Sequence, residues 1–126
     1  MIVRSYKELI VWQKSMDLTI MVYKAVKQLP KEEIFSLSDQ IRRAAISIPS
    51  NIAEGQQRLS GKEFIHFLSI AKGSLAELET QLMICERLNY MTSAQTKPIM
   101  NLCIEISKML NSLLKQLQNR DEKGSA

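Results

Sequence analysis

Between residues 64 and 85, apolar side chains recur every three or four positions, the spacing that places side chains on one face of an α-helix. Ser60 stands where a helix N-cap is expected, and Glu63 follows three residues later. Leu59 can pack against Phe64 across this cap. The pattern predicts a helix from about Ser60 to about Asn89, roughly 40 Å long at about 1.5 Å per residue. The apolar residues are Phe64, Phe67, Ala71, Leu75, Leu78, Leu82 and Cys85.

Two earlier segments have the same periodicity. The first is expected to run from about Ser5 to Gln28 and to end before Pro30. The second is expected to begin near Ser36, whose hydroxyl could cap the amides around Asp39, and to end near residue 57. The first segment is apolar on two faces, which indicates contact beyond its own bundle. One face contains Leu9, Trp12, Met16, Tyr23 and Val26, and the other contains Leu18, Met21, Val22 and Ala25.

The fourth periodic segment has an open start. Thr92 and Gln95 resemble a capping box, whereas Pro98 would interrupt the second turn of a helix that began there. No internal repeat and no strand alternation is present, so we expect an all-α, antiparallel up-and-down four-helix bundle over residues 1–119. A flexible C-terminal tail is expected over residues 120–126. The apolar residues of the fourth segment are Ile99, Leu102, Ile106, Met109, Leu113 and Leu117.

Pro49 lies inside the apolar stripe of the second segment. Proline in a helix interior removes a backbone donor and costs about 3 kcal/mol. Here it would free the carbonyl of Ala45, and Ser47, Ser50 and Asn51 supply polar groups close by. We therefore expect a helix that is continuous but kinked at Pro49.

Small side chains occur on both sides of the expected contact between the second and third helices. Pairing the two helices in reverse brings Ala44 and Ala45 level with Gly73 and Ser74. Small residues allow two helix backbones to approach closely. We therefore interpret Gly73 as a packing residue rather than as part of a phosphate-binding loop, since no Gly-rich phosphate motif is present.

The composition excludes several classes of protein. The chain has 126 residues, 45% apolar and 24% charged, which is ordinary for a globular domain. No apolar run approaches the ~18–20 residues of a membrane span, and the N-terminus has early charges and no small-residue cleavage site, so a cytoplasmic location is expected. Cys85 and Cys103 are expected to be buried thiols, and His66 is the only histidine. We expect no metal site, no cofactor, no catalytic residues and no enzymatic activity.

The formal charge of +4 is concentrated in the first part of the chain. Residues 1–31 contain six basic and two acidic residues, so this segment alone carries 6 − 2 = +4. A basic surface of this kind favours a polyanionic partner. The basic residues are Arg4, Lys7, Lys14, Lys24, Lys27 and Lys31.

Four stretches, "YKELIVWQKSMDL", "LSDQIRRAAISIPSNIAEG", "KEFIHFLSIAKGSLAELETQL" and "MLNSLLKQL", together resemble the family of 23S rRNA intervening-sequence proteins from about Ser5 to Leu117. The fold is also similar to that of the accessory variability protein of diversity-generating retroelements. The resemblance implies a bacterial, ring-like homopentamer of four-helix bundles, with nucleic-acid binding as its usual proposed role and no established catalytic residues. Tyr6, where Phe is more usual, and Pro98 depart modestly from the family pattern.

A pentamer would bring the charge to about +20 and combine weak phosphate contacts through avidity. Lys7 and Lys14 are one heptad apart and would form a phosphate-binding stripe on the first helix, with Arg58 at a turn. Arg42 and Arg43 are adjacent, hence about 100° apart on a helix. Both are candidate nucleic-acid-binding residues. One of them is expected to pair, either internally or across a subunit, for example with Glu54 or Glu77 of a neighbour, and the other to be exposed.

Trp12, Asn51 and Glu54 are candidates for an oligomer interface or a polar network. Asn51 and Glu54 lie off the apolar stripe, so a polar network at a subunit contact, plain solvated residues and a binding site are the alternatives for them. RNA is the favoured ligand, and the alternative is a protein-docking scaffold for a nucleic-acid enzyme such as a reverse transcriptase, or for a ribosome-associated factor. Binding through phosphates weakens steeply with salt, whereas apolar docking does not. No membrane partner is expected.

Overall fold

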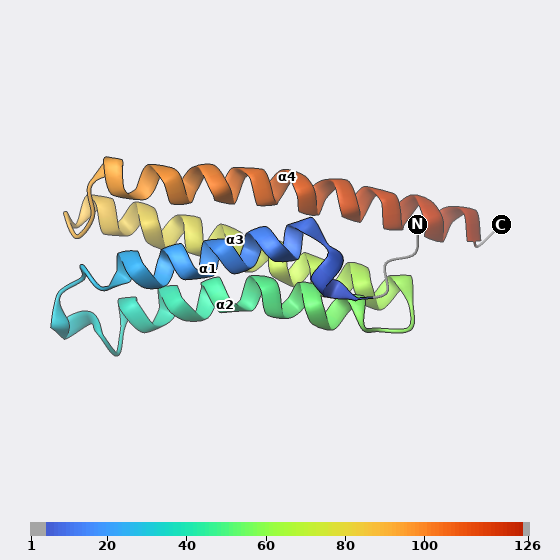
Figure 1. The fold of residues 1–126 in the computed structure, drawn as a ribbon, viewed down its shortest axis with the longest axis horizontal. Coiled ribbons are helices and arrows are strands. Elements are labelled where there is room, and N and C mark those ends of the chain that lie inside the picture. Colours follow the sequence, from blue (N-terminus) through green and yellow to red (C-terminus); the bar gives the residue numbers. More distant parts are fainter. Residues whose placement is uncertain (1–4, 125–126) are drawn as a thin grey trace.

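The computed structural model describes the backbone of residues 5–124 and the side chains of residues 5–120. This part of the chain is all-α and contains no strand, as the periodicity predicted. Figure 1 shows four helices lying lengthwise beside one another, with the α1–α2 and α3–α4 connections at one end and the α2–α3 turn at the other. The helices are α1 (Ile10–Val26), α2 (Leu37–Gln56), α3 (Gly61–Arg87) and α4 (Ser93–Gly124), with 3-10 turns η1 (Tyr6–Glu8) and η2 (Lys31–Glu33).

The core follows the predicted stripes with local differences in register. In α4 the buried side chains include Cys103, Leu110 and Leu114, each directly following a predicted core residue that is only partly buried. Because apolar residues stand next to one another at these points, periodicity alone cannot decide which of the two faces inward. The fully buried centre of the bundle includes Leu18, Ile41, Ile48, Ile52, Leu68, Leu75, Leu78, Leu82, Ile106 and Leu110.

The first helix begins later than predicted. The Ser5 hydroxyl accepts a hydrogen bond from the Lys7 amide and caps the short turn η1. Leu9 then has an extended backbone, with φ −74° and ψ 121°, and separates η1 from α1. The expectation of one continuous helix from Ser5 to Gln28 is therefore wrong at both ends, since α1 spans only Ile10–Val26.

The N-terminus of α2 is capped by a carboxylate and not by the predicted hydroxyl of Ser36. Glu33 Oε2 accepts hydrogen bonds from the Leu37 amide at 3.3 Å and from the Ser36 hydroxyl at 2.8 Å. A negative charge at this position also complements the helix dipole. The second carboxylate oxygen of Glu33 accepts a hydrogen bond from the Tyr90 hydroxyl at 3.4 Å. This bond links the α1–α2 connection to the α3–α4 connection.

Pro49 is accommodated inside α2 by a side chain from another helix. The Ala45 carbonyl, which loses its helical donor at Pro49, lies 3.2 Å from the hydroxyl of Thr19 on α1. The same hydroxyl lies 2.8 Å from the Ser15 carbonyl. We expected polar residues of α2 itself to lie near the Ala45 carbonyl, but its hydrogen-bond donor in the structure is Thr19 of α1. The helix is continuous across the proline, and the kink stays a prediction.

The close approach of α2 and α3 occurs at a glycine that we did not predict. A Cβ at Gly55 would lie 2.8 Å from Phe67 Cβ and 3.0 Å from Phe64 Cδ1. At Gly73, by contrast, an added Cβ would meet nothing within 4 Å, and the residue is exposed. The interpretation of Gly73 as a packing residue is wrong, whereas its neighbour Ser74 does lie in the contact.

The caps of α3 and α4 match the sequence signals. The Ser60 hydroxyl accepts from the Glu63 amide at 3.2 Å. Thr92 and Gln95 form a reciprocal box, in which each side-chain oxygen accepts from the other residue's amide, at 2.9 and 3.2 Å. Helix α4 thus starts at Ser93 and runs through Pro98, which is exposed.

At its other end, α4 continues to Gly124, past the predicted bundle boundary at residue 119. Residues 125 and 126 of the predicted tail lie outside the described residues. In the described part of the chain, no helix combines the length and apolar composition that a membrane span requires.

Candidate functional site

Lys7 and Lys14 do not form the predicted stripe. Lys7 is exposed on η1, and the extended backbone at Leu9 interrupts the helix between the two lysines. Lys14 Nζ lies 2.7 Å from Glu105 Oε1 on α4. Its charge is therefore compensated within the same chain, and heptad spacing does not bring the two lysines onto one helical face.

Arg42 and Arg43 are both engaged within their own chain. Arg43 Nε lies 2.9 Å from Asp39 Oδ2 one turn earlier, and its side chain is 78% exposed. Arg42 Nη2 donates to the Ile34 carbonyl at 3.3 Å, and its guanidinium carbon lies 6.0 Å from the centre of the Tyr23 ring. Arg42 thus joins the end of α1 to the segment that precedes α2.

Arg58 is likewise held against the bundle. Its Nη2 lies 2.8 Å from Glu54 Oε1, and its guanidinium carbon lies 4.8 Å from the centre of the Phe67 ring. The carboxylate of Glu54, predicted for an oligomer interface or a polar network, is therefore paired with Arg58, four residues later in the same chain.

Asn51 belongs to a polar network between α2 and α3. Its amide nitrogen donates to the Ser47 carbonyl at 2.8 Å and contacts the Ser47 hydroxyl at 2.9 Å. The hydroxyls of Ser47 and Ser74 lie 2.7 Å apart across the two helices. Asn51 thus forms a polar network within its own chain, and its predicted role at a subunit contact or in a binding site stays a prediction.

A surface that combines cations with exposed aromatic rings lies where α1 connects to α2. We call Tyr23, Lys27, Lys31, Phe35 and Arg42 the α1–α2 corner. Phe35 is 94% exposed, and both lysines are exposed and have no ion pair within the described residues. The unpaired Lys24 lies next to it on α1. Sequence reasoning missed Phe35, although its position between Pro30 and Ser36, outside every apolar stripe, was a signal that it has no place in the core.

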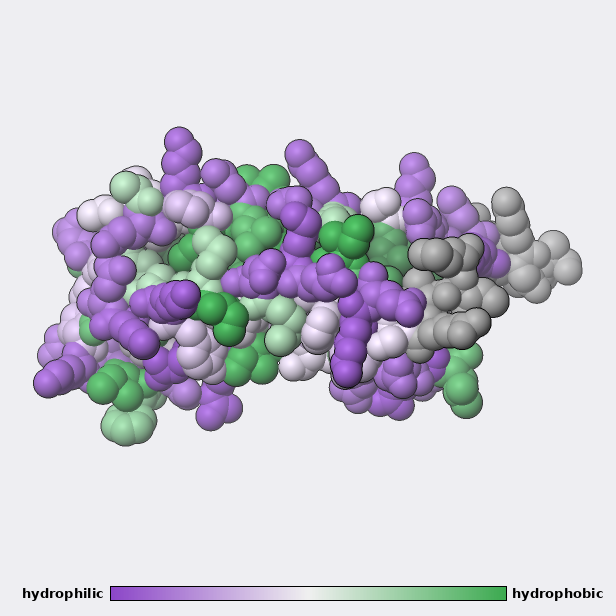
Figure 2. Space-filling model, in the orientation of Figure 1, coloured by the Kyte–Doolittle hydropathy of each residue, from purple (hydrophilic) through white to green (hydrophobic). Residues whose placement is uncertain are grey.

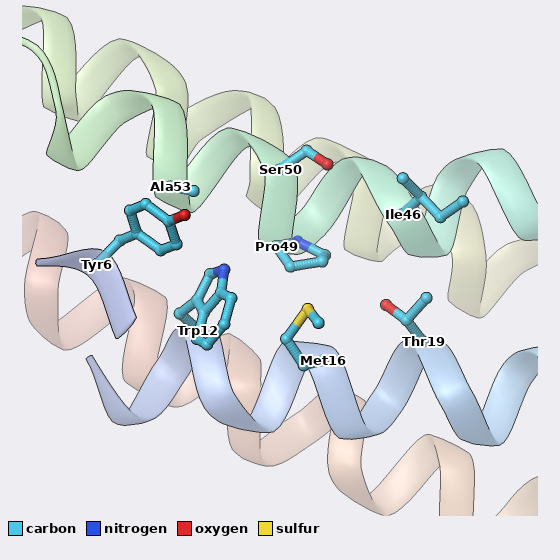
Figure 3. A pocket seen from close by; sticks show the side chains of 8 residues that line it. All are labelled: Tyr6, Trp12, Met16, Thr19, Ile46, Pro49, Ser50 and Ala53. Carbon is cyan, nitrogen blue, oxygen red and sulfur yellow. The ribbon is translucent and has the colours of Figure 1, made fainter. Parts of the chain in front are cut away.

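The second candidate surface is an open apolar groove of about 360 Å³ between α1 and α2. Figure 3 shows Trp12 and Met16 on α1 pointing across the groove toward Pro49 on α2. The rings of Tyr6 and Trp12 meet edge to face with centroids 5.2 Å apart. On the face drawn in Figure 2, hydrophobic patches lie between hydrophilic side chains. The groove is lined by Tyr6, Trp12, Met16, Thr19, Ile46, Pro49, Ser50 and Ala53.

The two cysteines are buried, as predicted, and belong to the core. Burial, with a smaller contribution from Glu33, raises the pKa of Cys85 to about 11. Burial, with a smaller contribution from Glu79, raises the pKa of Cys103 to about 12. Both thiols are therefore protonated at neutral pH and are poor nucleophiles. Among the described residues, no group of three or more His, Cys, Asp or Glu side chains is placed to hold a metal ion.

Comparisons with known proteins point to one family. The family model described as 23S rRNA-intervening sequence protein matches residues 7–112. A crystal structure of a protein with unknown function from the S23 ribosomal protein family of Bacteroides thetaiotaomicron is 34% identical to this chain. The two superpose with a TM-score of 0.78, and the match covers 84% of this chain and 99% of that one. No curated protein matches the chain.

Proposed function

The chain belongs to the family of 23S rRNA-intervening sequence proteins, and we propose that it is a non-enzymatic homo-oligomer that binds nucleic acid, with RNA favoured, through a basic surface. In this proposal the bundle is antiparallel and bent at Pro49, and copies of it close into a ring, a pentamer, in the cytoplasm. The observation that carries the proposal is the α1–α2 corner, where Lys27 and Lys31, which have no ion pair among the described residues, occur in the same short stretch as the exposed Phe35, and where Arg42 lies over the Tyr23 ring.

Charge supports a polyanionic partner at this corner. Lys24, Lys27 and Lys31 have no carboxylate within ion-pairing distance among the described residues, in contrast to Lys14 and Arg58. Cations held near one another without counter-charges attract phosphate, and each phosphate contact releases counterions. A ring would repeat the corner once per subunit, so weak contacts to one RNA would add through avidity.

The RNA contact can be tested by charge reversal. We expect the double variant Lys24→Glu/Lys27→Glu to bind a fluorescein-labelled RNA at least about tenfold more weakly than the wild type in fluorescence anisotropy. Its slope of log affinity against log salt should be shallower by about 0.7 per lost phosphate contact on a single strand. The matched control is Lys108→Glu/Lys115→Glu on α4, which makes the same change in net charge at exposed positions. Equal losses in both double variants would mean that only net charge matters and that the corner is not the binding surface.

The groove between α1 and α2 supports self-association, with a second copy of the chain as its occupant. It is apolar, and Met16 and Ile46 on its two sides remain 41% and 43% exposed in one subunit. Trp12, predicted for the oligomer interface, lies in it. A subunit that covers this groove would bury aromatic and thioether surface without leaving an unpaired charge.

Light scattering tests this contact. We expect Met16→Glu and Ile46→Glu to reduce the mass of the assembly to that of a monomer, because each places a charge in the covered groove. Ile104→Glu, at an equally exposed site on α4, should keep the wild-type mass. A wild type that is itself a monomer would reject the ring, and groove variants with the wild-type mass would reject this surface as the contact.

The alternative function, a docking scaffold for a nucleic-acid enzyme or a ribosome-associated factor, rests on the same groove. Apolar docking is insensitive to salt, whereas phosphate binding is not. Binding of such a protein factor that persists unchanged at high salt, by a chain that binds no RNA at low salt, would therefore favour the scaffold.

A further inference from the structure

The ring of Phe35 is held out into solvent by a well-anchored segment of backbone. Phe35 is 94% exposed, although neighbouring residues are tied down on both sides. Glu33 caps α2 and accepts from Tyr90, and Arg42 donates to the Ile34 carbonyl. An aromatic ring presented in this way gains free energy from any partner that covers it.

The surroundings of Phe35 indicate what that partner is. Lys27 directly follows the last residue of α1, Lys31 begins the turn η2, and the Arg42 guanidinium lies over the Tyr23 ring. A purely apolar partner would need none of these cations. Cations interleaved with aromatic faces are the arrangement that binds single-stranded nucleic acid, with phosphates on the cations and bases on the rings.

We propose that the α1–α2 corner binds single-stranded RNA, with Phe35 stacking on an unpaired base and Lys27 and Lys31 contacting the phosphates beside it. The inference rests on the proposed RNA binding and adds to it a preference for unpaired strands. In a duplex the bases are already stacked on one another, so Phe35 has no base face to contact.

One carboxylate opposes this site. Glu32 is exposed beside Lys31, whereas the carboxylate of Glu33 is occupied by the cap of α2 and by Tyr90. Glu32→Gln removes a charge that repels phosphate, and we expect it to strengthen binding of single-stranded RNA about two- to fivefold at low salt.

Removal of the ring is the direct test. We expect Phe35→Ala to weaken binding of a labelled single-stranded 12-mer of adenosine nucleotides at least about fivefold, the lower end of the effect of losing one stacked base. Affinity for the same 12-mer annealed to its complement, and the salt dependence, should be unchanged. The control is Leu59→Ala, which removes an even more exposed apolar side chain at the other end of the bundle and should change neither affinity.

Two further variants separate stacking from simple apolar contact. Phe35→Trp should keep the affinity for the single strand, because it keeps an aromatic face, whereas Phe35→Leu should behave like Phe35→Ala. If Phe35→Leu binds as well as the wild type, or if single strand and duplex lose affinity equally in Phe35→Ala, the stacking site is rejected.

The experiment also distinguishes this inference from the function on which it rests. A wild type that binds no RNA at low salt would reject the proposed function. A wild type that binds RNA with a steep salt dependence, together with Phe35→Ala of unchanged affinity, would reject the stacking site alone. If Phe35→Ala lowers the mass of the assembly in light scattering and leaves RNA affinity intact, Phe35 is a subunit contact and the inference is overturned.

Discussion

Helix α2 has two neighbours, and it contacts them in different ways. Against α3 it is close, because Gly55 meets Phe64 and Phe67 and the hydroxyls of Ser47 and Ser74 lie 2.7 Å apart. Against α1 it is in contact at Thr19, whose hydroxyl donates to the Ala45 carbonyl, and an open groove of about 360 Å³ lies alongside this contact. One helix thus has a side that is closely packed within the bundle and a side where an apolar groove stays open.

The size of the side chains at each contact explains the difference. Toward α3, α2 presents Gly55 and Ser47. Toward α1, the groove is lined by the bulky Trp12, Met16, Ile46 and Pro49 as well as by Thr19, Ser50 and Ala53. Bulky side chains hold helix axes farther apart. Small side chains thus allow the close contact with α3, whereas the bulky ones beside α1 border a groove whose apolar surface stays exposed.

The largest effect that would test this contrast is expected at Gly55. We expect Gly55→Ala to lower the free energy of unfolding by about 1–3 kcal/mol, the usual cost of overpacking. Its methyl group would come within 2.8 Å of Phe67 Cβ, which belongs to a helix and cannot simply turn away. Urea denaturation followed by circular dichroism measures the change.

The matched control is Gly73→Ala on α3. The added methyl group meets no atom within 4 Å, so only helix propensity acts, and we expect a gain of up to about 1 kcal/mol. Equal losses at Gly55 and Gly73 would show that α2 and α3 are not in close contact at Gly55.

The contact of α1 with α2 depends on Thr19, and a smaller effect is expected there. Thr19→Val keeps the shape of the side chain but removes the donor to the Ala45 carbonyl, so we expect a loss of about 0.5–1.5 kcal/mol. In a Pro49→Ala background the amide at position 49 can bond to that carbonyl, and the loss should be smaller. A double-mutant cycle in thermal or urea unfolding measures this coupling. Independent effects of the two substitutions would contradict the assigned role of Thr19.

The smallest effect is expected where α1 meets α4. The ion pair of Lys14 with Glu105 has side chains 34% and 49% exposed, so solvent screens it. We expect Lys14→Met to cost no more than about 0.5 kcal/mol, and the cost to vanish at high salt. A larger cost that persists in 1 M NaCl would show that α1 is held in place by α4 more than by α2.

The candidate site was only partly predictable. Trp12, predicted for an oligomer interface or a polar network, lines the groove between α1 and α2, and its place in an interface stays a prediction. The prediction that Lys7 and Lys14 lie on one helical face was wrong, because the start of α1 at Ile10 has no strong local signal. The pairing of Lys14 with Glu105 was not predicted either, because the two residues are far apart in the sequence. Phe35 was missed because periodicity describes helices and says little about the connections between them.

By itself, the sequence determined the four helices and the caps of two of them. Ser60 with Glu63 and Thr92 with Gln95 are local signals, since each bond joins residues within one turn. Only the tertiary structure decided which glycine lies in a contact, which of two adjacent apolar residues faces inward, and which hydroxyl serves the carbonyl freed by Pro49. These depend on the distance and rotation of one helix relative to another, which are set by all the side chains between them together.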